Sequence, residues 1–270
     1  MNPGSVLEVR DVTVRFGGLT ALDAVSLSVP PRHVMGVIGP NGAGKTTLLN
    51  VLCGFIRPDD GQVLIGGRHH QVRPHQLASL GVARTLQGVG LYGGLTALEN
   101  VMVGATCKAS AGFWSALLSL PRSGRDERKL RGLAAQALER VGAADVADAR
   151  PPELSYGMRK RIALARALVA RPGLILLDEP ASGLAEAELD ELGALIRDLA
   201  EEGSLMVVEH HVDLMMSVCD SIVVLDFGKV IAAGTPAEVQ ANPAVTAAYL
   251  GTADSGPGPV EPSANGGPTG

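Results

Sequence analysis

The amino-acid sequence predicts an α/β fold with a mostly parallel sheet that is covered by helices on both faces. Short apolar runs alternate with amphipathic helical segments along most of the chain. The runs at 34–38 and 174–177 contain no polar side chain, which is typical of strands that are buried on both faces. With 46% apolar residues, a chain of 270 residues can also bury a substantial core.

The first third of the chain alternates between predicted strands and one helix. We expect strands at 6–18, 33–39, 62–67 and 82–87, and a helix at 45–54. The segment 33–39 is a short apolar run that leads into a glycine-rich turn, and the helix follows this turn directly. This order places a loop at the carboxyl end of a buried strand.

The middle block has a different character, because helical signals replace strand signals. Thr96 and Glu99 form a capping-box pattern at a helix start. The segment 126–142 places its apolar residues on one helical stripe, and another helix is expected at about 156–170. We therefore predict a helical subdomain over about 88–170.

The last third returns to alternating strands and helices. Strands are expected at 174–179, 204–210, 222–226 and 230–234, and helices at 185–202, 212–219 and after Thr235-Pro236. Residues 252–270 are rich in Gly, Pro and Ser and contain almost nothing to bury, so they predict a disordered tail.

Charge and cysteine content exclude several function classes. The chain has 23 Lys and Arg against 28 Asp and Glu, and a net charge of −5 disfavours a general nucleic-acid binder. Cys53, Cys107 and Cys219 lie far apart, and neither a C-x-x-C pattern nor a His/Cys cluster accompanies them, so we expect a reducing compartment and no zinc site. The sequence has no signal-peptide pattern and no apolar run near the roughly 18–20 residues that span a bilayer. We expect a soluble or peripheral protein.

The stretch "GPNGAGKTT" follows a predicted strand and opens a predicted helix. It fits the phosphate-loop pattern G-x-x-x-x-G-K-[ST] and comprises Gly39, Pro40, Asn41, Gly42, Ala43, Gly44, Lys45, Thr46 and Thr47. Its backbone N–H groups can converge on phosphate oxygens, Lys45 can reach the β- and γ-phosphates, and the Thr46 hydroxyl can bind Mg²⁺. A glycine-rich turn that merely caps a helix is the alternative. The flanking strand and helix favour binding of a nucleoside triphosphate.

Two adjacent acids end the apolar run "LILLDEP". Because a fully buried strand tolerates no acid in its interior, Asp178 and Glu179 belong at its carboxyl end, where parallel sheets bind ligands. We expect Asp178 to hold Mg²⁺, directly or through water, and Glu179 to polarise the attacking water. An ordinary acidic strand end before a loop is the alternative.

Together these motifs resemble the ATP-binding subunits of ABC transporters over residues 6–250. Further motifs stand in the family's order: a glutamine loop at Gln87 in "RTLQ", a signature motif "LSYG", a D-loop position "SGLA" at 182–185, and a switch histidine in "VEHH". The resemblance implies a P-loop NTPase core of ABC type with an antiparallel β subdomain and a helical subdomain. It implies one ABC domain over 1–251, with ATP and Mg²⁺ as cofactors.

The resemblance also implies roles for single residues. Gln87 would touch Mg²⁺ or the attacking water and sense the permease; alone, it could be a polar strand end. His210 would contact the γ-phosphate and orient Glu179, although a lone histidine is more often structural and His211 could compete for the role. Phe16 would stack on adenine, with a place in the core as the alternative.

Ser155 precedes a predicted helix and is by itself typical of a helix N-cap. By resemblance, Ser155, Tyr156 and Gly157 would face the γ-phosphate of ATP that a partner subunit holds. Three positions depart from the family pattern, which has Gln or Glu at Met158, Asp or Asn at Ala185, and often Asp at His211.

Four stretches narrow the resemblance to the longer ATPase subunit of branched-chain amino-acid importers: "RFGGLTAL", "LTALENVMVGA", "FWSALLSLPRSGRDERKL" and "GTPAEVQANPAVTAAYLG". This implies an ATPase that powers import through a separate permease at the cytoplasmic face of the membrane. A sister or identical ATPase subunit would complete an ATP-sandwich dimer, and a solute-binding protein would act indirectly. Alternatives are an importer of urea or another polar solute, a lipid or lipopolysaccharide exporter, and a soluble ABC factor that acts on ribosomes or DNA. The basic stretch 121–131 suggests a solvated helix face, or a contact with lipid headgroups or a permease loop.

Overall fold

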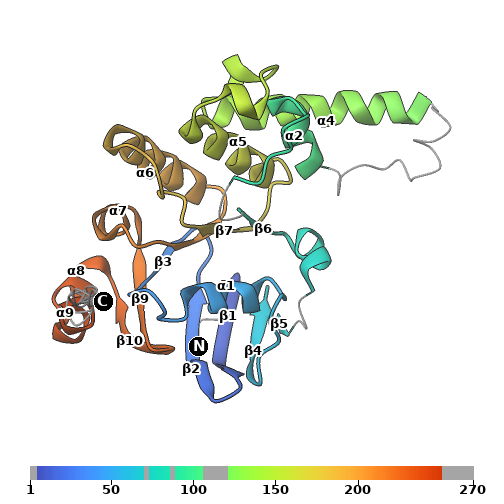
Figure 1. Ribbon diagram of the computed structural model, residues 1–270. Helices are drawn as coiled ribbons and strands as arrows, with labels where there is room; N and C mark the ends of the chain where they lie inside the picture. Colours follow the sequence, from blue (N-terminus) through green and yellow to red (C-terminus); the bar gives the residue numbers. More distant parts are fainter. Residues whose placement is uncertain (1–4, 70–72, 86–88, 106–120, 251–270) are drawn as a thin grey trace, which may run out of the picture.

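The computed structural model describes residues 5–69, 73–85, 89–105 and 121–250. Figure 1 shows a helical part above a parallel sheet and an antiparallel sheet below it. Gln87, residues 113–120 at the start of the stretch "FWSALLSLPRSGRDERKL" and the predicted tail at 252–270 lie outside the described residues. The α/β fold class expected from the sequence is confirmed.

The parallel sheet contains six strands in the order β10-β9-β3-β8-β7-β6. Five are mutually parallel, and β10 pairs antiparallel with β9. The strands are β3 (Val34–Ile38), β6 (Val82–Arg84), β7 (Leu174–Asp178), β8 (Ser204–Val208), β9 (Ser221–Asp226) and β10 (Lys229–Gly234). Every residue of β3, β7 and β8 is buried, which explains why their sequences do not alternate.

The antiparallel sheet has the strand order β2-β1-β4-β5. Its strands are β1 (Leu7–Phe16), β2 (Leu19–Val29), β4 (Asp60–Ile65) and β5 (Arg68–His69). Buried side chains of β1 and β2 pack with α1 (Lys45–Leu52) in one hydrophobic core. This core extends to one face of the parallel sheet, through Met35, Val37 and Leu176 among others.

The opposite face of the parallel sheet packs in a second core, which includes Val34, Ile38 and Leu177. Alternate residues of β3 thus enter different cores, and the sheet is covered on both faces as predicted. The covering elements on this side include α6 (Glu186–Ala200) and α7 (Val212–Val218). The chain then continues through α8 (Pro236–Gln240) and α9 (Pro243–Leu250).

Three helices pack together in the upper part of Figure 1: α2 (Ala97–Gly104), α4 (Pro121–Arg140) and α5 (Tyr156–Leu168). The Thr96 hydroxyl accepts a hydrogen bond from Glu99 N, and the Glu99 carboxylate accepts one from Thr96 N, so the predicted capping box forms. Residues 127–129 and 131 on α4 are exposed, whereas Ala134 and Leu138 on its other side are buried. The limits of a helical subdomain at 88–170 stay a prediction.

Some elements differ from the sequence prediction. β6 ends at Arg84, short of the predicted 87, and β2 and α9 were not predicted. Short 3-10 turns also connect the elements: Pro74–Gln76, Ala78–Leu80, Ala144–Val146 and Pro151–Glu153. Within the described ranges, no helix is both long and apolar enough to cross a membrane.

Candidate functional site

The predicted phosphate loop joins β3 to the amino terminus of α1. Gly44 precedes the helix with φ of 105°, and a Cβ atom there would lie 2.7 Å from the carbonyl oxygen of Ala21, so this position requires glycine. The Lys45 Nζ atom donates to the carbonyl oxygens of Gly39 at 2.6 Å and Pro40 at 2.9 Å. The carbonyl groups of the loop therefore surround the ammonium group of Lys45.

Acidic side chains gather at the carboxyl ends of two neighbouring strands. Asp178 is the last residue of β7 and pairs with Val208 of β8, while Glu179 N donates to the Val208 carbonyl at 2.9 Å. Glu209 follows β8 directly and is completely buried. Burial lowers the pKa of Lys45, and the negative charges of Glu179 and Glu209 partly offset this. The structure therefore brings the phosphate-loop lysine within electrostatic reach of both acids.

Asp178 is held by a cation from the neighbouring strand. Its Oδ2 atom accepts from Arg84 Nη2 at 2.8 Å, and Arg84 Nη1 donates to Asn50 Oδ1 of α1 at 3.1 Å. Asp178 N also donates to the Thr85 hydroxyl at 3.3 Å. A carboxylate and the exposed Thr46 side chain offer the hard oxygen donors that Mg²⁺ prefers. These donor types suit a magnesium ion, which Thr46 and Asp178 would hold.

Glu179 has an unusual backbone, with φ of 46°. This left-handed conformation is uncommon for a non-glycine residue and is often found at functional sites. The Lys160 Nζ atom of α5 donates to the carbonyl oxygens of Glu179 at 3.1 Å and Pro180 at 2.8 Å, and also to that of Ser182. One ammonium group therefore fixes the turn that carries the predicted base.

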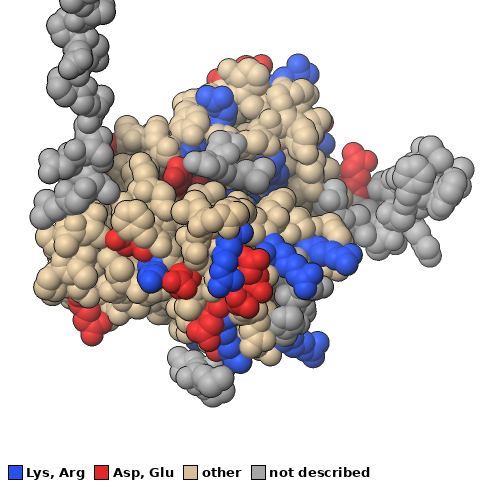
Figure 2. Space-filling view, turned by 60° about the horizontal axis from the view of Figure 1, so that its bottom comes forward, with Lys and Arg blue, Asp and Glu red and all other residues tan. Residues whose placement is uncertain are grey.

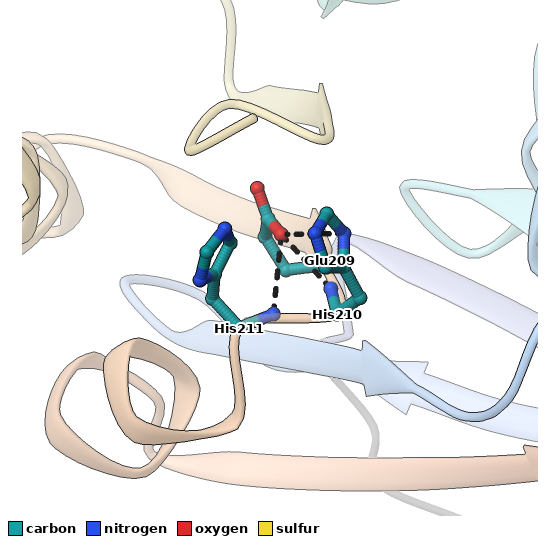
Figure 3. A group of neighbouring side chains, drawn as sticks. All are labelled: Glu209, His210 and His211. Atoms are coloured by element: carbon teal, nitrogen blue, oxygen red, sulfur yellow. Dashed lines mark hydrogen bonds and ion pairs between the residues drawn. The ribbon is translucent and has the colours of Figure 1, made fainter. Parts of the chain in front are cut away.

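The end of β8 carries a compact polar group (Figure 3). The Glu209 Oε1 atom accepts from Ala181 N at 2.6 Å, and Oε2 accepts from His210 N at 2.8 Å. The His210 Nδ1 atom lies 3.4 Å from Oε2, and 49% of the His210 side chain is exposed. The predicted switch histidine thus lies beside a buried carboxylate with its ring open to solvent.

The predicted signature residues lie at the start of α5. The Ser155 hydroxyl accepts from Met158 N at 3.2 Å, so Ser155 is the helix N-cap. A Cβ atom on Gly157 would overlap the Glu188 carboxylate, which itself accepts from Ala185 N at 2.9 Å. Glycine at 157 therefore allows the close approach of the α6 start to the signature turn.

Two further predicted site residues have different outcomes. Phe16 lies at the end of β1 and is 50% exposed, so its ring is open to solvent and not buried in the core. Gln87 lies outside the described residues, and its predicted contacts stay a prediction.

Sequence reasoning missed three residues that organise this site: Arg84, Lys160 and Glu209. Glu209 had a signal, since it follows the buried run of β8 as Asp178 and Glu179 follow that of β7. Arg84 and Lys160 had none, because nothing in their local sequence identifies the distant Asp178 carboxylate or the 179–182 carbonyls as their partners.

Comparisons with known proteins agree with this geometry. A family model described as "ABC transporter" matches residues 22–182, and one described as "Branched-chain amino acid ATP-binding cassette transporter" matches residues 229–255. The high-affinity branched-chain amino acid transport ATP-binding protein BraF of Pseudomonas aeruginosa is 42% identical over 92% of this chain and 98% of its own length. The lipopolysaccharide export system ATP-binding protein LptB of Haemophilus influenzae is 31% identical over the same shares of the two chains, 92% and 98%.

A solved structure has a similar fold over most of the chain. The ADP conformation of MJ1267, an ATP-binding cassette of an ABC transporter, matches with a TM-score of 0.79 and 29% sequence identity. The match covers 92% of this chain and 99% of MJ1267. The fold, the phosphate loop and these matches agree: the chain belongs to the ABC transporter family, as an ATP-binding, ATP-hydrolysing subunit.

Proposed function

We propose that this subunit powers the uptake of branched-chain amino acids through a separate membrane permease, working as a peripheral protein at the cytoplasmic face of the membrane. The observation that carries the proposal is the ATPase site, with Lys45, Glu179 and Glu209 on one edge of the sheet, in a chain most of which matches BraF. The family model for branched-chain amino-acid cassettes, which matches the carboxyl-terminal segment, supports the solute class.

Residues at this edge have complementary roles in phosphoryl transfer to water. The loop amides and the Lys45 ammonium would hold the phosphate oxygens, and Thr46 and Asp178 would hold Mg²⁺. The bound ion would neutralise charge on the β- and γ-phosphates. Glu179 accepts a proton from the attacking water, and His210 contacts the γ-phosphate and orients Glu179.

The nucleotide base and the glutamine loop complete the proposal. Val14 of β1 pairs with Leu22 of β2, which lies against the Gly44 position of the phosphate loop. Phe16 is two residues further along β1, about 7 Å at a rise of roughly 3.4 Å per residue. This short separation supports stacking of Phe16 on the adenine of the same nucleotide. Gln87 would bind at the Mg²⁺ or attacking water and sense the permease.

Dimerisation with a sister or identical ATPase subunit is part of the proposal. Ser155, Tyr156 and Gly157 would face the γ-phosphate of the partner's ATP, so that two subunits enclose two nucleotides. The amino-terminal turn of α5 is suited to this, because its first backbone N–H groups and its helix dipole favour an anion. A solute-binding protein would deliver the amino acid to the permease.

Charge distribution argues against the alternative of a soluble ABC factor that acts on nucleic acid. On the face shown in Figure 2, Lys and Arg side chains lie beside Asp and Glu side chains. The antiparallel sheet carries opposite-charge pairs of this kind, Arg10 with Glu8 and Arg15 with Asp60. A nucleic-acid binder is expected to present a continuous basic stripe.

Reconstitution of the complex tests the proposed function. The subunit is expressed with the membrane proteins that co-purify with it, and ATPase activity is measured with leucine, isoleucine, valine, urea or no solute in the presence of the solute-binding protein. We expect stimulation by the branched-chain amino acids alone. Stimulation by urea, or co-purification with ribosomes or with a lipopolysaccharide exporter, would contradict it.

Two variants test the catalytic assignment. Lys45→Ala should abolish ATP binding, because the buried cation that faces the phosphates is lost. Glu179→Gln should retain ATP binding and form a stable dimer with ATP, but hydrolyse it at a rate that is lower by at least about 10²-fold. Turnover at the parental rate in Glu179→Gln would remove Glu179 from its role.

A further inference from the structure

Glu209, His210 and His211 form a second group of potential metal ligands, separate from the proposed magnesium ligands Thr46 and Asp178. We propose that these three side chains bind a divalent transition metal of the zinc class, and that the bound metal inhibits ATP hydrolysis by withdrawing His210 from the nucleotide. The inhibition rests on the proposed role of His210, whereas the metal binding does not.

The distances between the ligand atoms suit zinc. One ligand atom from each residue lies within 4.8 Å of the other two, and His210 Nδ1 is 3.4 Å from Glu209 Oε2. Tetrahedral zinc with bonds of about 2.0–2.2 Å needs ligand atoms roughly 3.3 Å apart. The pair Glu209–His210 already meets this spacing. The His211 ligand atom, which lies within 4.8 Å of the other two, would complete the site after a rotation of its side chain toward them.

The carboxylate is already oriented by the backbone. Ala181 N donates to Glu209 Oε1 at 2.6 Å, while the backbone N–H groups of His210 and His211 donate to Oε2 at 2.8 and 3.4 Å. Hydrogen bonds of this kind fix the direction of a metal-binding carboxylate and raise affinity. The site therefore needs little reorganisation at its buried end.

Figure 3 shows the two imidazole rings on either side of the Glu209 carboxylate. Their centroids are 4.5 Å apart and their planes are tilted by 36°, so a metal bound by both would lie at the edge of the rings, in line with their in-plane nitrogen lone pairs. His210 is half exposed, which leaves an entry path and an open position for water. Among the described residues, Glu209, His210 and His211 form the one group of three His, Cys, Asp or Glu side chains that are close enough to share a metal ion.

The chemistry of the ligands separates this site from the magnesium site. Two imidazoles and one carboxylate favour zinc, cobalt, nickel or copper, whereas Mg²⁺ prefers oxygen ligands and keeps its waters. Burial lowers the pKa of both Lys45 and Lys160, and the negative charge of Glu209 partly offsets this, so these two ammonium groups compete electrostatically with a cation bound at Glu209. The imidazole nitrogens, which the lysines cannot replace, therefore provide the selectivity.

Direct binding tests the site without reference to activity. Untagged full-length protein is titrated with Zn²⁺ by calorimetry in excess Mg²⁺, and with Co²⁺ as a spectroscopic probe of imidazole ligation. We expect one metal per chain, and His211→Asn should weaken binding by on the order of tenfold or more. His75→Asn is the matched control, because His75 is exposed on a separate turn and should leave binding unchanged.

The adjacent pair His69 and His70 provides a second control. Zinc binding that His69→Asn/His70→Asn removes and His211→Asn retains would overturn the proposed site, as would a Co²⁺ spectrum without imidazole bands. ATPase activity is measured separately, where His211→Asn should require about tenfold more zinc for half inhibition. If zinc binds with the expected residue dependence but does not inhibit, the metal site stands and the proposed inhibition is refuted.

Discussion

Replacing Arg84 by methionine removes the guanidinium that faces Asp178 and keeps a long apolar stem. The pair is nearly dry, since only 12% of the Arg84 side chain and 4% of the Asp178 side chain are exposed. Removing one partner of a buried ion pair costs about 3–5 kcal/mol, because the other charge stays buried without compensation. We expect a loss near 3 kcal/mol, since the residual exposure of Arg84 lets water approach the carboxylate.

A double-mutant cycle separates this effect from lost packing. Asp178→Asn removes the charge, so Arg84→Met/Asp178→Asn should be more stable than the sum of the two single changes predicts. A coupling energy of about 2 kcal/mol is expected for two groups in direct contact. The cycle needs four proteins, and the stability of each can be measured without nucleotide.

Urea unfolding followed by circular dichroism gives the free energy of unfolding of each of the four proteins. The slope of this free energy against urea concentration is fitted as one value common to all four. Arg84→Met within about 1 kcal/mol of the parent would refute the reasoning, because such small effects are typical of exposed ion pairs. Additive single effects would refute it as well. Either result would mean that water reaches Asp178 far more than the structure indicates.

Three other predictions concern the helices and a buried thiol. Gly157→Ala displaces the Glu188 carboxylate from Ala185 N, and we expect it to lower the free energy of unfolding by about 1 kcal/mol through the lost helix cap. The double variant Gly157→Ala/Glu188→Ala should be no less stable in urea unfolding than Glu188→Ala alone. The hydrogen bond from Thr96 N lowers the pKa of Glu99 from its usual value of 4.5. The stabilisation by this carboxylate is therefore present above pH 4.5 and is lost as the pH falls through the lowered pKa. The melting temperatures of Glu99→Ala and the parent should converge in acid. Burial raises the pKa of Cys219 to about 12, so mass spectrometry should find this thiol unmodified by iodoacetamide at pH 8 until urea unfolds the chain.

Much of the fold could be predicted, because the central strands carry an unambiguous signal. The sequences of β3, β7 and β8 are short and almost entirely apolar, as expected for strands that are buried on both faces, and all their residues are buried in the structure. β2 was missed although Leu22, Val25 and Leu27 alternate with more exposed residues. Ala24 has φ of 50° and the β1–β2 register shifts beside Val25, so an irregular pairing obscures the period of two.

The candidate site was predictable only where a local pattern carries the chemistry. The phosphate loop and the acids after β7 follow from a motif and from strand burial, both of which are local. The partners that hold them are 94 residues apart in the case of Arg84 and Asp178, and 19 to 22 in the case of Lys160 and its carbonyls. Such pairs depend on strand order and helix packing, which a single sequence does not encode in any short window.

Lys160 links the two nucleotide-facing ends of one chain. The amino-terminal turn of α5, proposed to face the partner's ATP, and the turn at Glu179, proposed to activate water for the chain's own ATP, are joined by its hydrogen bonds to the 179–182 carbonyls. The Tyr156 ring strengthens the link, since it lies 5.2 Å from Lys160 Nζ and packs beside Gly183. On the proposed function, a shift of the signature turn by the partner's nucleotide that exceeds the reach of the Lys160 side chain would move the backbone of Glu179 or break these bonds. Either response would change the position of the base, so on the proposed function Lys160 would couple occupancy of one site to turnover at the other.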